Sequence, residues 1–158
     1  MIRSPGSRLM PLRACDAYGR CANDAILDAI GYAGANGARV VNMSFGSPVF
    51  SQAEQDAIDA YPQTLFVAAA GNDGLNLDAP GVNSYPCETP VANVICVAAT
   101  DQIDALPSFS NYGATAVDLA APGVNVLSTM AAPSSASQPT PQRLASIREQ
   151  VSLLADYL

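Results

Sequence analysis

An apolar run that stops abruptly at a turn signal constrains this chain more than any other feature. Residues 64–70 read Thr-Leu-Phe-Val-Ala-Ala-Ala, and Gly-Asn-Asp-Gly follows at 71–74. A short apolar run bounded by turn residues is typical of a strand buried on both faces of a parallel sheet, although its alanines also fit a helix. We favour the strand. Asn72 then lies just past its carboxyl end, where open α/β sheets place their functional groups.

The side chain of Asn72 has two interpretations. Its amide nitrogen can donate hydrogen bonds to a carbonyl oxygen that becomes negative during a reaction, which is the role of an oxyanion hole. Alternatively, Gly71 and Asn72 only form the turn, because both residue types tolerate positive φ. From this motif alone, the turn is the better-supported interpretation.

The chain around this run predicts two βαβ units. Strands are expected at 9–12 and 40–44, and between them residues 22–36 repeat apolar side chains every three or four positions, as one face of a helix does. A second helix at 51–61 separates the strand at 40–44 from the run at 64–70. Helices between successive parallel strands define βαβ units, so the predicted fold class is α/β with a doubly wound parallel sheet.

The helix ends also carry signals. Asn23 or Asp24 is expected to cap the first helix, and Gly37 is expected to end it. Ser51 and Glu54 have the spacing of a capping box, in which the serine accepts from the third helical amide and the glutamate reaches back. The residues of the second helix that are expected to face the core are Ala53, Ala57, Ile58 and Tyr61.

Three segments, taken in their order and spacing, resemble the subtilisin-like serine proteases, or subtilases (peptidase S8 family). They are residues 39–46 (Arg-Val-Val-Asn-Met-Ser-Phe-Gly), residues 69–72 (Ala-Ala-Gly-Asn), and residues 109–113 followed by 117–123. The resemblance covers about residues 9–129. It implies a subtilisin-like sheet with helices on both faces, incomplete at both ends, and a secreted serine endopeptidase with an Asp-His-Ser triad.

The resemblance also assigns site residues. Residues 44–46 would present a backbone strand to the substrate, since strand addition needs free backbone groups and a glycine lets the peptide approach. An equal alternative for Ser44 is a polar strand end, and without a nearby histidine nothing would activate it as a nucleophile. Ser84 would lie in the loop that closes the primary specificity pocket. The implied site residues are Asn72 for the oxyanion, and Ser44, Phe45, Gly46, Ala70, Gly71 and Ser84 for the substrate.

The catalytic triad itself is not found. The chain contains no histidine, and residues 130–135 read Met-Ala-Ala-Pro-Ser-Ser where the nucleophile's Gly-Thr-Ser-Met-Ala motif is expected. The aspartate and histidine motifs would precede residue 1. We therefore expect a fragment of a serine endopeptidase that is inactive alone, with a peptide or protein as its partner. The alternative is a non-catalytic, peptide-binding pseudo-protease module. A nucleotide site is disfavoured, because residues 71–74 match neither phosphate-binding glycine motif.

The acidic charge of the chain disfavours nucleic acid as a partner and makes a bound calcium ion worth considering. The net charge is −7, which argues against nucleic acid. The resemblance leaves calcium as a candidate structural ion, but no Asp-x-Asp-x-Asp-Gly loop is present, so a solvated acidic surface is favoured. All cations are arginines, and none falls between Val40 and Gln142, where the carboxylates are Glu54, Asp56, Asp59, Asp73, Asp78, Glu88, Asp101, Asp104 and Asp118.

Four cysteines form two close pairs, Cys15 with Cys21 and Cys87 with Cys96. Two short disulfides, each worth about 2–3 kcal/mol, are favoured over a four-thiolate zinc site. Disulfides and the resemblance indicate a secreted or extracytoplasmic protein, although residues 1–6 begin no signal peptide. No apolar run approaches membrane-spanning length, so no membrane association is expected.

The expected organisation has three parts. Residues 1–129 would be a partial subtilase catalytic domain, and residues 130–141 an Ala/Ser/Pro-rich linker. Residues 142–158 place apolar side chains three and four apart, as an amphipathic helical tail does. This tail could pack on the domain, mediate self-association or be unrelated to the protease. Its apolar residues are Leu144, Ile147, Val151, Leu154 and Leu158.

Overall fold

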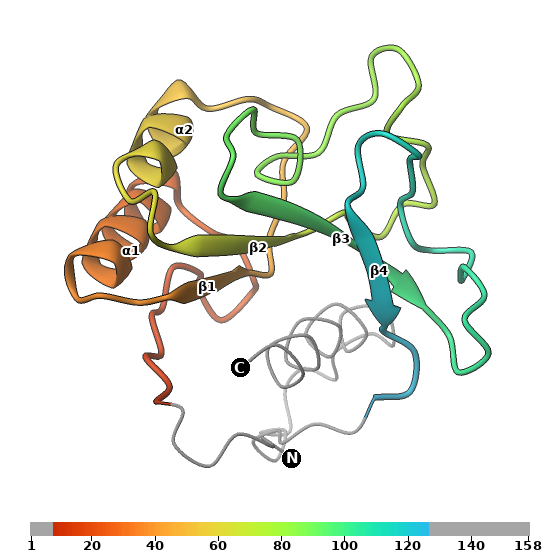
Figure 1. Cartoon of the computed structure of the whole chain (residues 1–158), viewed down its shortest axis with the longest axis horizontal. Coiled ribbons are helices and arrows are strands. Elements are labelled where there is room, and N and C mark those ends of the chain that lie inside the picture. Colours follow the sequence, from red (N-terminus) through yellow and green to blue (C-terminus); the bar gives the residue numbers. More distant parts are fainter. Residues whose placement is uncertain (1–7, 127–158) are drawn as a thin grey trace.

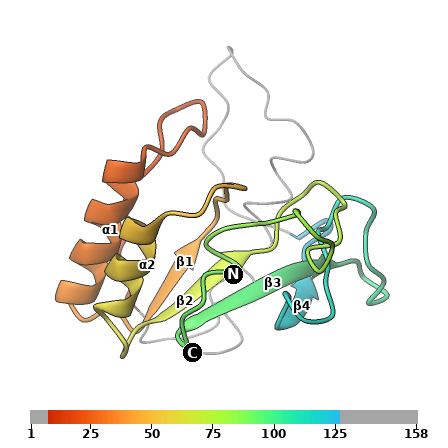
Figure 2. The same cartoon turned by 90° about the horizontal axis from the view of Figure 1, so that it is seen from above.

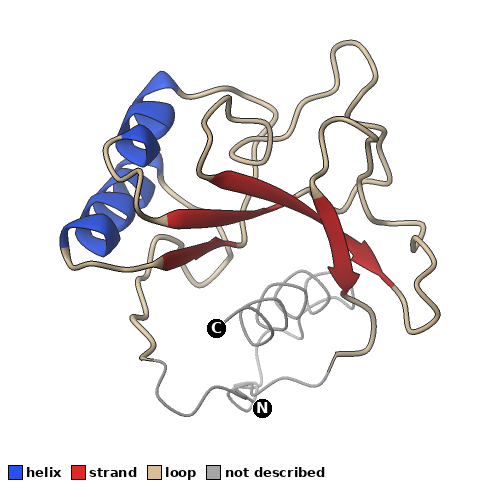
Figure 3. Cartoon of the chain, viewed as in Figure 1, coloured by secondary structure: helices blue, strands red, loops and turns tan. Residues whose placement is uncertain are grey.

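The computed structural model describes residues 8–126. Four strands form one fully parallel sheet in the order β1-β2-β3-β4, and two helices pack beside it (Figures 1 and 3). The run at 64–70 is therefore a strand, and the α/β class with a parallel sheet is confirmed. The elements are α1 (Asn23–Ala35), β1 (Val40–Met43), α2 (Gln52–Asp59), β2 (Leu65–Ala69), β3 (Val94–Thr100) and β4 (Leu119–Pro122).

The register of the sheet brings the carboxyl ends of the strands to one edge. Met43 pairs with Ala68, and Ala69 pairs with Val97. Only the β1-to-β2 connection contains a helix, α2, whereas loops join β2 to β3 and β3 to β4. Because all strands run the same way, the segments that leave β1 and β2 start side by side.

The main core lies between the sheet and the two helices. Figure 2 shows α1 and α2 on one side of the sheet. Phe66, Ala68 and Met43 are almost fully buried in the cluster that the helices share with the sheet. The helices contribute Ile26, Ile30 and Ile58 to the same cluster. This apolar cluster fixes the sheet and so fixes where its strands end.

The predicted strand at 9–12 is wrong. Leu9 is 70% exposed and Met10 is 41% exposed, and neither belongs to a strand. Pro11 has no N–H to donate, and no strand within residues 8–126 pairs with this segment. The first predicted βαβ unit is therefore absent from the described residues, and α1 leads into β1 without a strand before it.

The helix ends follow the predicted signals only in part. The N-cap of α1 is Ala22, without a side-chain cap, so the predicted cap by Asn23 or Asp24 is wrong. Gly37 follows the helix with a φ of 73°, which confirms its role as the end. The Oγ of Ser51 accepts from the amide of Glu54 at 3.3 Å, which confirms half of the capping box.

The other half of the capping box is missing because Glu54 turns inward. Its side chain is only 8% exposed, its Oε1 has no hydrogen-bond partner, and burial raises the pKa of its carboxyl. Ala53, expected inside, is exposed instead. Ala57, Ile58 and Tyr61 meet the core as predicted, so only the first turn of α2 differs from the prediction.

Both predicted disulfides are present, Cys15–Cys21 and Cys87–Cys96, so the four-thiolate zinc site is excluded. In the part of the chain that the structure describes, no cluster of three His, Cys, Asp or Glu side chains is placed to hold a metal ion. No helix between residues 8 and 126 combines the length and apolar character needed to cross a membrane. The linker predicted at 130–141 and the tail predicted at 142–158 lie outside the described residues.

The close contact between Gly34 of α1 and the Tyr61 ring allows a test of how α1 packs. A Cβ added at Gly34 would overlap the Tyr61 ring, whereas one added at Gly31 would meet nothing within 4 Å. Gly34→Ala is therefore expected to lower the free energy of unfolding by about 1–3 kcal/mol, although alanine favours helix. The matched Gly31→Ala should raise it by about 0.5–1 kcal/mol. Urea titration of both variants would contradict this packing if the two changes had the same sign.

Burial of Glu54 predicts a pH-dependent effect. Its folded-state pKa lies above the ordinary value of 4.5, so the folded state disfavours the ionised carboxylate and stability falls as pH rises through the folded pKa. Glu54→Gln should therefore stabilise the protein at pH 7, and the gain should vanish below about pH 4. Urea titrations across pH measure this. The control is Asp59→Asn, which removes an exposed carboxylate from the same helix. An equal gain for Glu54→Gln at pH 7 and below pH 4 would contradict a raised pKa for Glu54.

Candidate functional site

Three of the predicted substrate-binding residues meet at the carboxyl edge of the sheet. Gly46 lies beyond β1, Gly71 lies beyond β2, and Ser84 comes from the loop between β2 and β3. A Cβ on Gly46 would lie 3.7 Å from the Ser84 Oγ, and one on Gly71 would lie 3.8 Å from the same oxygen. The two glycines therefore flank a single buried hydroxyl that comes from a distant loop.

The segment after β1 is held on the Ser84 loop by backbone pairing. Ser47 and Tyr85 exchange two amide-to-carbonyl hydrogen bonds, of 2.9 and 2.8 Å, as an isolated antiparallel bridge. The rings of Phe50 and Tyr85 pack edge to face at 5.3 Å. Ser44 and Gly46 stay exposed, while Phe45 is half-buried against the main core. The chain between β1 and this bridge thus presents its backbone to solvent from a fixed position.

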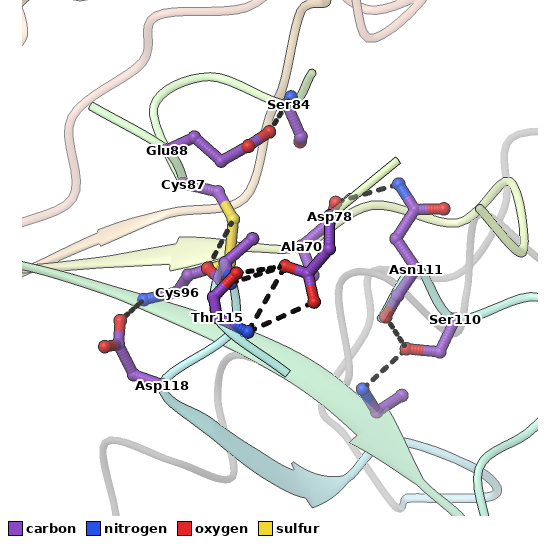
Figure 4. Close-up of a disulfide and its surroundings, with 12 residues drawn as sticks. Ala70, Asp78, Ser84, Cys87, Glu88, Cys96, Ser110, Asn111, Thr115 and Asp118 are labelled. Atoms are coloured by element: carbon purple, nitrogen blue, oxygen red, sulfur yellow. Dashed lines mark hydrogen bonds between the residues drawn. A yellow bond between two sulfur atoms is a disulfide. The ribbon is translucent and has the colours of Figure 1, made fainter. Parts of the chain in front are cut away.

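The Ser84 loop is closed by its own hydrogen bonds. The amide of Ser84 donates to the Glu88 carboxylate at 2.5 Å, and the amide of Glu88 donates back to the Ser84 carbonyl at 2.9 Å (Figure 4). The neighbouring disulfide joins Cys87 to Cys96 on β3. Ser84 is therefore fixed in place relative to the sheet, although it lies far from any strand in sequence.

The turn at residues 71–74 is held by one side chain, that of Asn111. Its Nδ2 donates to the Ala70 carbonyl at 2.9 Å, and its Oδ1 accepts from the amides of Asp73 and Leu75, both at 3.0 Å (Figure 4 shows the first). The amide of Asn111 also donates to the Gly71 carbonyl at 3.0 Å. Asn111 is 3% exposed. We call this set of four hydrogen bonds the Asn111 clamp.

Gly71 is required by the Asn111 clamp for two reasons. Its φ is +111°, which L side chains rarely adopt, and an added Cβ would collide with the Asn111 Nδ2. Ser110 fixes the clamp to the sheet, because its Oγ accepts from the Ala99 amide of β3 at 2.8 Å. The clamp was not predicted from the sequence, since its side-chain contacts span 36 to 41 residues. The one available signal was that Asn111 falls inside a segment that resembles the family.

Asn72, the predicted oxyanion residue, follows directly on this clamped turn. Its Oδ1 is enclosed and has no hydrogen-bond partner in the described structure. An acceptor buried without any partner costs about 1–3 kcal/mol, and a water or a bound group can supply the missing hydrogen bond. Asn42, at the end of β1, shows the same pattern: its Nδ2 donates to the Ser44 Oγ at 2.8 Å while its Oδ1 is unpaired. An unpaired side-chain oxygen therefore lies near the carboxyl end of β1 and another lies three residues beyond β2.

Asp78 makes a second anchor for the long loop. Its carboxylate accepts from the Thr115 hydroxyl at 2.6 Å and from the amides of Ala114, Thr115 and Ala116 (Figure 4). The Thr115 hydroxyl, with these amides, lowers the pKa of the Asp78 carboxyl. The loop that carries Ser84 is thus tied to the segment before β4.

A polar cavity of about 360 Å³ lies beside this anchor, and its carboxylates come from Asp78, Glu88 and Asp118. Each already serves the backbone: Glu88 accepts from Ser84, and Asp118 accepts from the Cys96 amide at 2.7 Å. These carboxylates act as loop anchors in the described structure. The expectation of a structural calcium ion gains no set of ligands from them.

Comparison with known proteins gives one consistent result. The model of the subtilase family matches residues 3–148. A thermophilic serine proteinase of Bacillus sp. (strain AK1) is 41% identical over 129 residues, covering 80% of this chain and 30% of that protein. Subtilisin BL of Lederbergia lenta is 41% identical over 128 residues, covering 80% of this chain and 45% of its own length. This chain therefore spans less than half the length of either relative.

A solved protease structure has a fold similar to that of this chain. The crystal structure of a lanthipeptide protease superposes with a TM-score of 0.62 at 27% identity, covering 72% of this chain and 37% of that one. The subtilisin-like, doubly wound α/β class predicted from the sequence is confirmed by this likeness.

The Asn111 clamp predicts a large effect from one truncation. Asn111→Ala would leave the Ala70 carbonyl and the amides of Asp73 and Leu75 without their partner, so the free energy of unfolding should fall by roughly 2–4 kcal/mol. Urea titration measures this change. The matched control is Asn83→Ala, an exposed asparagine of the same region, which should change stability by less than about 0.5 kcal/mol. Equal effects of the two variants would contradict the clamp.

Proposed function

The chain belongs to the subtilase family, and we propose that it forms the peptide-docking and oxyanion-stabilising part of a serine endopeptidase. The observation that supports this is the meeting of Gly46, Gly71 and Ser84 at the carboxyl edge of the sheet, next to Asn72. Backbone groups and a polar amide converge there from three separate segments. That is the arrangement that binding and polarising a peptide bond requires.

Docking uses backbone more than side chains. An extended peptide adds as a strand beside residues 44–46, whose backbone leaves β1 at an exposed position. Gly46 carries no side chain to keep the peptide away. Ser84, with Ala70 and Gly71 beside it, lines the place where the peptide's own side chain enters. Peptides or proteins are therefore the proposed substrates.

In this proposal, Asn72 stabilises the negative charge that forms on the scissile carbonyl oxygen and contributes little to peptide binding. When a nucleophile attacks the scissile carbonyl, its oxygen gains negative charge, and the Asn72 amide nitrogen donates a hydrogen bond to it. The Asn111 clamp holds the turn so that this donor needs no rearrangement at the moment of reaction. Loss of such an amide costs about 2.7–4 kcal/mol in transition-state stabilisation, a value known for a subtilisin and taken over from there.

The proton transfers of the reaction need groups that these 158 residues do not supply. The sequence has no histidine, and so no base of the family's kind to activate a serine. We propose that the chain alone binds peptides without hydrolysing them, and that turnover requires a histidine and a nucleophilic serine from elsewhere. Lacking both, the chain retains only binding and oxyanion stabilisation.

We also propose an extracytoplasmic location. One relative, at 36% identity over 151 residues, is the minor extracellular protease Epr of Bacillus subtilis (strain 168). The two disulfides support the same location, because disulfides persist in oxidising compartments.

A fluorogenic peptide assay beside a binding assay on the purified chain tests the main proposal. We expect a labelled extended peptide to bind, measured by fluorescence anisotropy, with no hydrolysis above the buffer rate. Hydrolysis that disappears in Asn72→Ala would show that the chain is an active protease and would overturn the proposed inactivity. Absence of peptide binding by folded protein would overturn the docking role.

Two substitutions separate docking from oxyanion stabilisation. A Cβ on Gly46 would make only ordinary contacts, at 3.6 Å from the Tyr85 carbonyl oxygen and 3.7 Å from the Ser84 Oγ, so Gly46→Ala should keep the fold. It should still weaken peptide binding about tenfold, because the added methyl stands where the peptide backbone approaches. Asn72→Ala should change binding by less than about twofold, since its hydrogen bond forms with charge that the bound peptide lacks. Equal losses for both variants would contradict these roles.

A further inference from the structure

Asn42 and Ser44 form a hydrogen-bonded side-chain pair at the carboxyl end of β1. The Asn42 Nδ2 donates to the Ser44 Oγ at 2.8 Å. Val41 and Met43, the neighbours of Asn42 along the strand, pack in the main core, and side chains alternate along a strand. Asn42 therefore lies on the opposite face of the sheet, beside its register partner Val67, which belongs to a separate small cluster.

The direction of this hydrogen bond leaves the hydroxyl proton of Ser44 unused. An amide nitrogen can only donate, so the Ser44 Oγ accepts through a lone pair and keeps its own O–H for another partner. Among the described residues, no acceptor takes that proton. Ser44 is exposed, whereas Asn42 is half-buried and its Oδ1 is enclosed. The hydroxyl is therefore held from the protein side, and its free O–H is left for a partner that arrives from solvent.

The backbone next to this hydroxyl is also unpaired. Phe45 and Gly46 follow β1, and neither takes part in a backbone hydrogen bond in the described part of the chain. Phe45 packs against the main core and Ser47 is bonded to Tyr85, so this short segment is nevertheless held in place. An extended peptide that pairs with such a segment presents its backbone carbonyl oxygens in a regular row beside it.

We propose that the Ser44 hydroxyl donates a hydrogen bond to a backbone carbonyl of the docked peptide, and that Asn42 is the positioning residue that keeps this donor free for the peptide. This inference rests on the proposed docking role of residues 44–46. It adds a contact to the peptide backbone, so it serves extended peptides whatever their side chains. Ser44 acts as a donor and not as a nucleophile, because the sequence has no histidine to activate it.

Asn42→Asp tests the direction of the hydrogen bond. An ionised aspartate has nearly the shape of asparagine but can only accept, so the Ser44 O–H would turn inward to it and no longer reach the peptide. A capped, uncharged fluorescent peptide should then bind the full chain about three- to tenfold more weakly, measured by anisotropy. The control is Asn83→Asp, which adds the same charge at an exposed position beside Ser84 and should change the affinity by less than about twofold.

A double-mutant cycle separates positioning from general damage to the fold. Ser44→Ala, at an exposed position, should also weaken binding about three- to tenfold. Asn42→Asp combined with Ser44→Ala should bind as Ser44→Ala alone does, because Asn42 acts only through the hydroxyl. Additive losses would overturn the proposal. Unchanged binding of Asn42→Asp would overturn it too, because the hydroxyl would then already donate inward in the unsubstituted chain.

A series of peptides tests the contact from the other side. In each peptide one carbonyl oxygen is replaced by sulfur, which accepts hydrogen bonds more weakly. One member of the series should bind the unsubstituted chain less tightly than the parent peptide, and this difference should disappear in Ser44→Ala. If no member shows this coupling, the Ser44 hydroxyl does not bind a peptide carbonyl and the proposal is wrong.

The outcomes also separate this inference from the docking role on which it rests. If the unsubstituted chain binds the peptide and Ser44→Ala binds it equally well, docking stands and only this inference is overturned. If the folded, unsubstituted chain binds no peptide, the docking role fails and this inference fails with it. Should Asn42→Asp not fold, Asn42→Leu replaces it: leucine has a similar shape and no polar group, and affinity equal to that of the unsubstituted chain would overturn the role of Asn42.

Discussion

The candidate site depends on one buried amide, that of Asn111. Its side chain satisfies a carbonyl at one end of the turn beyond β2 and two amides at the other. Without these bonds the turn would carry three backbone groups with neither water nor protein partners, which is costly inside a fold. Ser110, the residue before Asn111, connects this clamp to β3 because its Oγ accepts a hydrogen bond from the Ala99 amide. The orientation of Asn72 is therefore set by a segment almost forty residues away, not by the turn itself.

The parallel pairing of β1 and β2 determines where Gly46 and Gly71 lie. Since β1 and β2 run in the same direction with Met43 beside Ala68, the backbones after both strands leave the sheet at one edge. Gly46 and Gly71 follow, and each leaves space next to the Ser84 hydroxyl. The loop that brings Ser84 there is held by the Cys87–Cys96 disulfide and by Asp78. A rigid sheet and an anchored loop thus hold the backbone at Gly46 and Gly71 next to the buried Ser84 hydroxyl.

Under the proposed function, this chain supplies peptide docking and oxyanion stabilisation, and the proton transfers need groups from elsewhere. Amide donors and glycines stabilise charge and admit a peptide without changing protonation, so they need no histidine. The side-chain oxygens of Asn42 and Asn72 are buried without a hydrogen-bond partner in the described structure. On the side of the sheet away from α1 and α2, Val67, Val97 and Ala121 form a second, smaller buried cluster.

The sequence by itself determined what local patterns encode. The apolar run at 64–70 with its turn placed Asn72 just past a strand end, and the periodic spacing at 22–36 predicted α1. The three family segments identified the fold class, while the site residues that they imply stay a prediction. The tertiary structure decided what depends on neighbours distant in the chain. Residues 9–12 form no strand because they have no partner strand, Glu54 faces inward in place of Ala53, and Asn111 rather than the turn residues fixes Asn72. Periodicity and turn chemistry act over a few residues, whereas strand pairing, burial and a side-chain clamp exist only once segments tens of residues apart have met.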